Sequence, residues 1–159
     1  MLAYVSPLLR YWRMGMIPFG NRVQVSPNDE DHRALIHLLR PAGWSLDSAF
    51  GRVEAMKSLE TEPAPVVIVE RDLPDGNRKT LNNQLMQMPF PPKLIVTCRL
   101  ADERPWAEVL NLGGFDVLAR PFYPREVLRS IDSAWRHWET EWRKVKMAKL
   151  KRRPVAQLL

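Results

Sequence analysis

The chain has 159 residues, of which 45% are hydrophobic, and this supports one domain with a substantial core and an additional segment. Its single cysteine, Cys98, excludes an internal disulfide framework and a multi-cysteine metal site, and its apolar runs fall short of the ~18 residues that span a membrane. The single cysteine and a first segment without the pattern of a secretory signal lead us to expect a cytoplasmic protein. The net charge of +6 resides at the ends of the chain, so the globular part is not expected to be a basic binding surface.

The first half of the chain predicts two pairs of a strand followed by a helix. A short β-branched run at residues 23–26 indicates the first strand. Acidic residues open a helix at Asp29, and apolar side chains recur on one side of it until the breaking residues at 41–43. Residues 44–50 alternate weakly and predict a second strand, and residues 53–59 have the pattern of an amphipathic helix.

The most strongly apolar strand of the chain comes next. Residues 65–69 are apolar and mostly β-branched, which is typical of a strand buried on both faces of a parallel sheet, and Glu70 ends the run. The later predicted elements are a helix at residues 80–88, a strand at 94–97, a helix at 104–112, a strand at 115–119 and a long helix that begins at Pro124.

This alternation of strands and helices predicts an α/β fold. Repeated βαβ units with right-handed crossovers form a doubly wound, five-stranded parallel sheet of the flavodoxin-like kind, here with an extended C-terminal helix. We expect an N-terminal arm over residues 1–21, the domain over 22–138 and a basic helical extension over 139–159. Ligands collect at the carboxyl ends of parallel strands, so Glu70 is the first candidate for a functional residue.

Four motifs in residues 22–135 resemble the receiver domains of response regulators. In chain order they are Leu73-Pro74-Asp75-Gly76 after the third strand, Thr97 at the end of the fourth, Gly113 before the fifth, and Arg120-Pro121-Phe122 after the fifth. The resemblance implies a receiver-like fold and a role in phosphorelay signal transduction by two-component systems.

The resemblance also implies where a phosphoacceptor pocket would lie, and this chain departs from the family's pattern there. Glu70 occupies the position of the phosphoacceptor Asp, Pro27 and Asn28 occupy those of two metal-binding acids, and Arg120 replaces a Lys, whereas Thr97 is retained. Phosphoryl transfer needs a metal ion and a cation to neutralise the developing charge. We therefore expect a degenerate receiver-like domain that is not an enzyme, binds no metal or cofactor and is not phosphorylated at Glu70.

Two hypotheses describe what such a pocket does. Glu70 and Arg120 follow strands that end at the same edge of the sheet, so a guanidinium–carboxylate ion pair is expected between them. In the first hypothesis, the longer Glu70 side chain projects negative charge and mimics a phosphorylated state. In the second, the site has decayed and the ion pair only stabilises the fold.

The last predicted helix carries an apolar seam with a spacing of three and four residues. Its members are Leu128, Ile131, Trp135, Trp138, Trp142 and Val145. In one interpretation the seam packs against residues 8–12 of the N-terminal arm. In the other, Trp135, Trp138, Trp142 and Val145 form an interaction surface for a protein partner or for a second copy in a homodimer.

The sequence thus predicts a signalling or protein-interaction module. One alternative is a nucleic-acid-binding protein that uses the basic C-terminal helix. The other is a working, phosphorylatable response-regulator receiver that uses Glu70 or Asp72.

Overall fold

A computed structural model of the chain describes residues 22–61, 64–71, 73, 78–99, 108, 111 and 113–152. Its elements are β1 (Arg22–Val25), α2 (Asp29–Leu39), the 3-10 helix η1 (Arg40–Ala42), β2 (Asp47–Ala49), α3 (Arg52–Thr61), β3 (Val66–Glu70), α4 (Arg78–Met86), β4 (Lys93–Cys98), β5 (Asp116–Ala119) and α6 (Pro124–Lys151). The arm over residues 1–21 and most of the helix expected at 104–112 lie outside the described residues.

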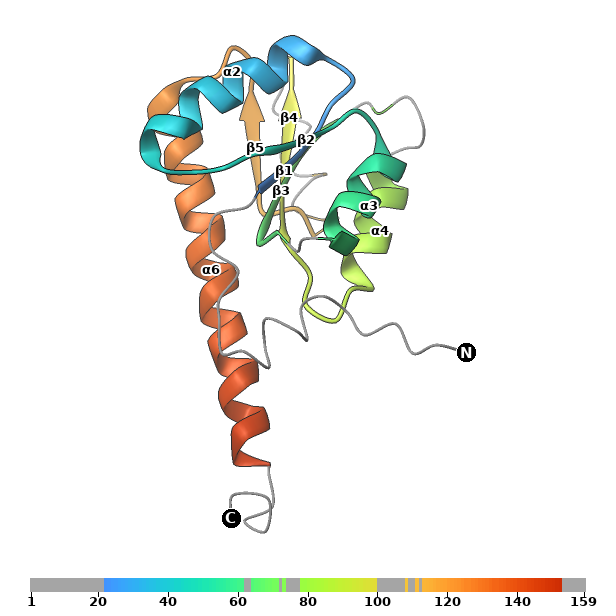
Figure 1. Cartoon of the computed structure of the whole chain (residues 1–159), viewed down its shortest axis with the longest axis vertical. Helices are drawn as coiled ribbons and strands as arrows, with labels where there is room; N and C mark the ends of the chain where they lie inside the picture. The colour runs from blue at the N-terminus through green and yellow to red at the C-terminus, as the bar shows by residue number, and fades with distance from the viewer. Residues whose placement is uncertain are drawn as a thin grey trace.

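The described strands form one parallel sheet in the order β2-β1-β3-β4-β5 (Figure 1). Among the described helices, α2 and α6 pack on one face of the sheet, and α3 and α4 pack on the other. This arrangement confirms the predicted doubly wound, five-stranded fold with a long C-terminal helix.

The central strand β3 is buried on both faces, as its composition predicts. Val66 and Ile68 pack with Leu35 of α2 and Ile131 of α6. The alternate residues of the strand, such as Val67, pack with α3 and α4 on the opposite face. Since successive side chains of a strand point to opposite faces, one apolar strand supplies both halves of the core.

The second strand is shorter than predicted because the residues before it end a helix instead. Gly43 adopts a left-handed conformation with φ of 80°, and its N–H donates to the carbonyl of Arg40 at 3.0 Å. The N–H of Trp44 donates to the carbonyl of Leu39 at 3.2 Å, which completes a Schellman motif. The backbone of Trp44 therefore closes the helical segment and does not extend β2.

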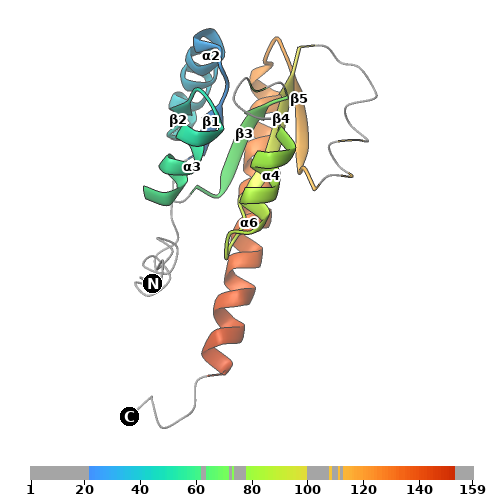
Figure 2. The ribbon, with the colours of Figure 1, turned by 90° about the vertical axis from the view of Figure 1, so that its right-hand side faces the viewer.

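The long helix α6 packs against the sheet with its first half and extends beyond it with its last turns (Figures 1 and 2). Trp138 and Trp142 are buried, with 1% and 4% of their surface exposed, and the ring of Phe90 packs edge-on against both. In this structure the segment before β4 covers Trp138 and Trp142 within the chain, whereas the residues 8–12 of the first interpretation lie outside the described part. Val145 remains 41% exposed.

No helix in the described part of the chain, not even α6, has an apolar stretch of the length needed to cross a bilayer.

Candidate functional site

The candidate site lies where the carboxyl ends of β1, β3, β4 and β5 meet. The parallel register places Val25 beside Val69 and Glu70 beside Thr97, so Ser26, which follows β1, comes next to Glu70. Arg120 follows β5 at the same edge. The topology of the sheet therefore brings together residues that are far apart in the sequence.

A buried ion-pair network occupies this edge. Nη2 of Arg120 lies 2.6 Å from Oε1 of Glu70, and Nη1 of Arg120 contacts Oδ2 of Asp31. The three side chains are only 9–12% exposed. One guanidinium thus neutralises carboxylates from two elements, which confirms the predicted pair between Glu70 and Arg120 and adds Asp31 to it.

Ser26 connects this network to the backbone of β1 and α2. Its hydroxyl donates to Oε2 of Glu70 at 2.8 Å, lies 3.3 Å from Oδ2 of Asp31, and accepts a hydrogen bond from the N–H of Asn28 at 3.1 Å. Nε2 of the buried His32 donates to the carbonyl oxygen of Ser26 at 2.8 Å, which assigns the proton to that nitrogen. Both oxygens of Glu70 are therefore engaged by neighbouring groups.

The two positions that the resemblance assigns to metal-binding acids are held by residues that lie outside the ion-pair network. Pro27 is exposed. The side chain of Asn28 caps the N-terminus of α2, because its Oδ1 accepts a hydrogen bond from the N–H of Glu30 at 3.0 Å. Neither side chain joins the ion-pair network. The third expected neighbour, Thr97, is buried at the end of β4 beside Glu70.

Sequence reasoning missed Ser26 and Asp31. Asp31 is one of three acids in the first turn of α2, and another of them, Asp29, pairs with Arg33 one turn further along the helix, on the surface. Asp31 lies on the side of α2 that faces the sheet and is buried. The available signal was helical geometry: residues two apart on a helix point to nearly opposite sides, so only one of the two acids can face the sheet.

A Mg²⁺ ion, which the receiver resemblance implies, does not fit these residues. Mg²⁺ requires octahedral oxygen ligands, usually including one or two carboxylates. The carboxylates of Asp31 and Glu70 are both directed at the guanidinium of Arg120, whose charge repels a second cation. Within the described ranges, no group of three or more His, Cys, Asp or Glu side chains is placed to hold a metal.

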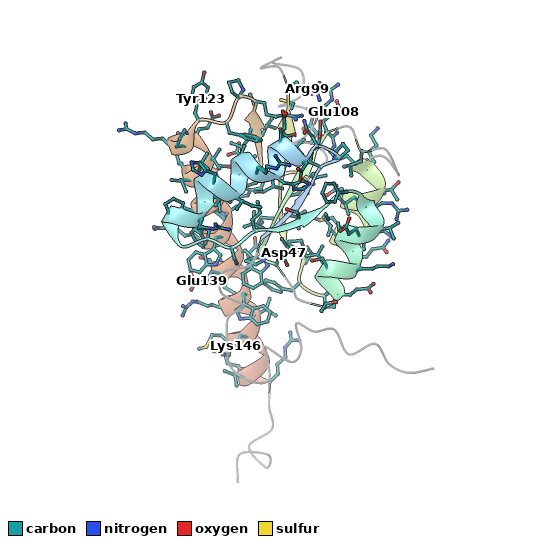
Figure 3. The ribbon with its side chains drawn as sticks, turned by 45° about the horizontal axis from the view of Figure 1, so that its top comes forward. Asp47, Arg99, Glu108, Tyr123, Glu139 and Lys146 are labelled. Carbon is teal, nitrogen blue, oxygen red and sulfur yellow. The ribbon has the colours of Figure 1, made fainter. Side chains whose placement is uncertain are left out.

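A groove of about 1020 Å³ runs beside the network, between α2 and the start of α6. Asp31 and Arg120 form its inner end, Ala34 and Leu38 of α2 line one wall, and Phe122 lines the other. Figure 3 looks toward this end of the sheet, where Arg99 and Tyr123 are labelled. The groove combines an apolar wall with charged groups, a composition common at ligand-binding sites.

No family model matches this sequence, and no curated protein matches it. Many solved structures, however, share its fold. The signal receiver domain of an HD domain-containing protein from Pseudomonas fluorescens Pf-5 is 22% identical, with a TM-score of 0.71, and the match covers 80% of this chain and 95% of that one.

Two further structures agree with this match. A CheY-like response regulator receiver domain protein from Methanospirillum hungatei JF-1 is 20% identical, with a TM-score of 0.68 and coverage of 77% of this chain and 98% of that one. A two-component response regulator from Clostridium difficile is 19% identical, with a TM-score of 0.66 and coverage of 74% and 96%. The chain therefore has the fold of response-regulator receiver domains.

Proposed function

We propose that this chain is a degenerate receiver-like signalling module that acts through protein contacts in one fixed state, without phosphorylation at Glu70 and without catalysis of its own. The observation that carries the proposal is the bridge that Arg120 makes between Glu70 and Asp31. The similar structures include response regulators and signal receiver domains, among them the receiver domain of a histidine kinase from Syntrophus aciditrophicus.

The oxygens of Glu70 are poorly placed to attack a phosphoryl group. A nucleophilic carboxylate must present an oxygen that is free to form the new bond. Oε1 of Glu70 is held by Arg120 and Oε2 by the hydroxyl of Ser26. An attack by Glu70 would require two charge-assisted hydrogen bonds to break in a buried site before any chemistry begins.

The same contacts favour the hypothesis of a fixed arrangement over the hypothesis that the site has simply decayed. Removing one partner from a buried ion pair typically costs about 3–5 kcal/mol, because it leaves an uncompensated charge. Arg120 serves two carboxylates and Ser26 contacts both, so a movement of any one group affects the others. A conformational change of the kind that phosphorylation drives would have to break this network.

The groove beside Arg120 is the surface that supports binding of a signalling protein. Its wall holds the apolar side chains of Leu38 and Phe122, and its inner end is the network itself. A partner in this groove would contact residues whose positions depend on Arg120. A partner protein in the groove would thus bind a surface whose shape depends on the fixed state of the pocket.

Intact-mass measurement with a small phosphodonor and Mg²⁺ tests the proposal. The full chain should keep its mass in acetyl phosphate, with and without Mg²⁺. As a positive control, the four changes Pro27→Asp, Asn28→Asp, Glu70→Asp and Arg120→Lys restore the residue types that the resemblance implies, and this variant should gain one phosphoryl group. A stoichiometric gain by the unaltered chain that is lost in Glu70→Gln would refute the proposal, and one that is lost only on substitution of Asp72 would favour a working receiver.

A further inference from the structure

The last turns of α6 and the residue after them, 143–152, form a segment of concentrated positive charge, which we call the terminal segment. The sequence holds seven Lys or Arg between positions 143 and 153 and no Asp or Glu after Glu141. Figures 1 and 2 show this part of α6 running beyond the sheet, and Lys146, labelled in Figure 3, lies on it. The charge is thus presented away from the domain.

Among the described residues, the acids nearest to the terminal segment leave three of its cations without an ion pair. Glu139 pairs with Arg143 at 2.7 Å, and Glu141 pairs with Lys93 of β4 at 2.9 Å. The side chains of Lys144, Lys151 and Arg152 are exposed. The helix dipole stabilises a cation near the C-terminus of a helix, but this effect is confined to the last turn. The charge here begins two turns earlier, so it points to an anionic partner.

The distribution of apolar side chains argues against a membrane surface as that partner. A helix that lies in a membrane interface gathers its apolar residues on one side. Val145, Met147 and Leu150 are exposed, and at ~100° per residue they are spread over about 200° around the helix axis. Met147 lies between Arg143 and Lys151 around the helix. Pairing of two copies through the terminal segment is opposed by repulsion between like charges.

A helix with cations on opposite sides can contact the phosphates along both walls of a duplex groove. Lys144 and Lys146 also lie about 160° apart around α6, so positive charge can reach two walls at once. An α-helix fits the major groove of B-DNA, which is about 12 Å wide and has phosphates along both walls, whereas the major groove of RNA is too narrow. Binding of single strands relies on exposed aromatic residues, and the sequence of the terminal segment contains none.

We propose that the terminal segment binds the phosphate backbone of duplex DNA without sequence preference. It has no Asn or Gln for reading adenine, and its Lys-rich composition is that of a backbone-binding helix. This activity does not depend on the state of the Glu70 pocket.

Fluorescence anisotropy with a labelled duplex of arbitrary sequence tests this inference on the full chain. If the terminal segment neutralises about five phosphates, the logarithm of the affinity falls against the logarithm of the salt concentration with a slope of about −4.5, a loss of about 500-fold between 50 and 200 mM salt. The triple variant Lys144→Gln, Lys151→Gln, Arg152→Gln should reduce the magnitude of this slope by about 2.7.

A charge-matched control separates the terminal segment from net charge. The triple variant Arg40→Gln, Arg125→Gln, Arg129→Gln removes the same charge from exposed positions in η1 and at the other end of α6, and it should leave the slope unchanged. The inference is overturned if the duplex does not bind at 50 mM salt, if the two triple variants behave alike, or if a single-stranded oligonucleotide binds equally well. Binding to phosphatidylserine vesicles without binding to the duplex would also overturn it.

Discussion

Ser26 follows β1 and Glu70 ends the neighbouring parallel strand β3, and the hydroxyl of Ser26 donates a hydrogen bond of 2.8 Å to Oε2 of Glu70. Arg120 takes the other oxygen of Glu70, so the carboxylate is held from two sides in a buried position. Within the described part of the chain, Nε of Arg120 and Nδ1 of His32 are buried without a hydrogen-bond partner. The rigidity of this network therefore rests on the contacts to Glu70 and Asp31, and the loss of either contact is costly. The stability of the domain should therefore be sensitive to each of these groups in a different degree.

The network is asymmetric, because one cation serves two acids. Arg120→Met leaves Asp31 and Glu70 close together without a cation and should lower the free energy of unfolding by about 3–5 kcal/mol. Glu70→Gln leaves Arg120 paired with Asp31 and should cost less. Urea unfolding of both single variants and the double variant should show coupling of about 1–3 kcal/mol. Additive effects would mean that Glu70 and Arg120 do not face each other.

Ser26→Ala removes the hydrogen-bond donor to Oε2 of Glu70. An unsatisfied buried oxygen costs about 1–3 kcal/mol, and urea unfolding measures this loss. Ser58→Ala in α3, which is only partly buried, is the control and should change stability by less than ~0.5 kcal/mol. Equal effects of the two substitutions would show that the hydroxyl of Ser26 does not support the carboxylate.

Asn28 should behave as a helix cap and not as a metal ligand. Asn28→Ala should destabilise the domain by about 0.5–2 kcal/mol, and Asn28→Asp should retain most of the stability, since both Asn and Asp are good N-caps. Thermal unfolding followed by circular dichroism measures both changes. The differences between the variants should be the same with and without Mg²⁺; a Mg²⁺-dependent gain in the unaltered chain would contradict this assignment.

The aromatic cluster on α6 should stabilise a single chain. Trp142→Glu places a charge in the contact with Phe90 and Trp138, so it should lower stability by several kcal/mol, on the order of a buried Trp truncation. Light scattering should give the same molar mass for the variant and the unaltered chain. Met147→Glu, at a position that is 56% exposed, is the control. A change from dimer to monomer on Trp142→Glu would instead show that Trp142 pairs between copies.

Local sequence patterns predicted those parts of the fold that depend on local physics. The apolar run at 65–69 indicated a central buried strand, and the structure has β3 at Val66–Glu70. Pro124 at a first helical position and the apolar seam predicted a long helix that begins at Pro124, and α6 begins there. The second strand was overestimated because weak alternation at Trp44 does not reveal that its N–H closes a Schellman motif.

The pairing of Glu70 with Arg120 could be predicted from the sequence, whereas the roles of Asp31 and Phe90 could not, because they depend on tertiary packing. Strand order places Glu70 and Arg120 at one edge, and opposite charges at one edge make a pair the natural expectation. The choice of Asp31 over Asp29 depends on how α2 is rotated about its axis, which the packing of Leu35 and Leu39 against the sheet determines. The role of Phe90 as cover for Trp138 likewise depends on a tertiary contact between segments far apart in the sequence.

The guanidinium of Arg120 is covalently part of the chain, and this determines how long the state of the pocket lasts. An acyl phosphate decays by hydrolysis, so the phosphorylated state of a protein has a limited lifetime. An ion pair between side chains has no such lifetime, and neither chelators nor the nucleotide supply of the cell can reset it. Under the proposed function, the only variable left is the number of molecules present, so synthesis and degradation of this protein would set both the strength and the duration of its signal.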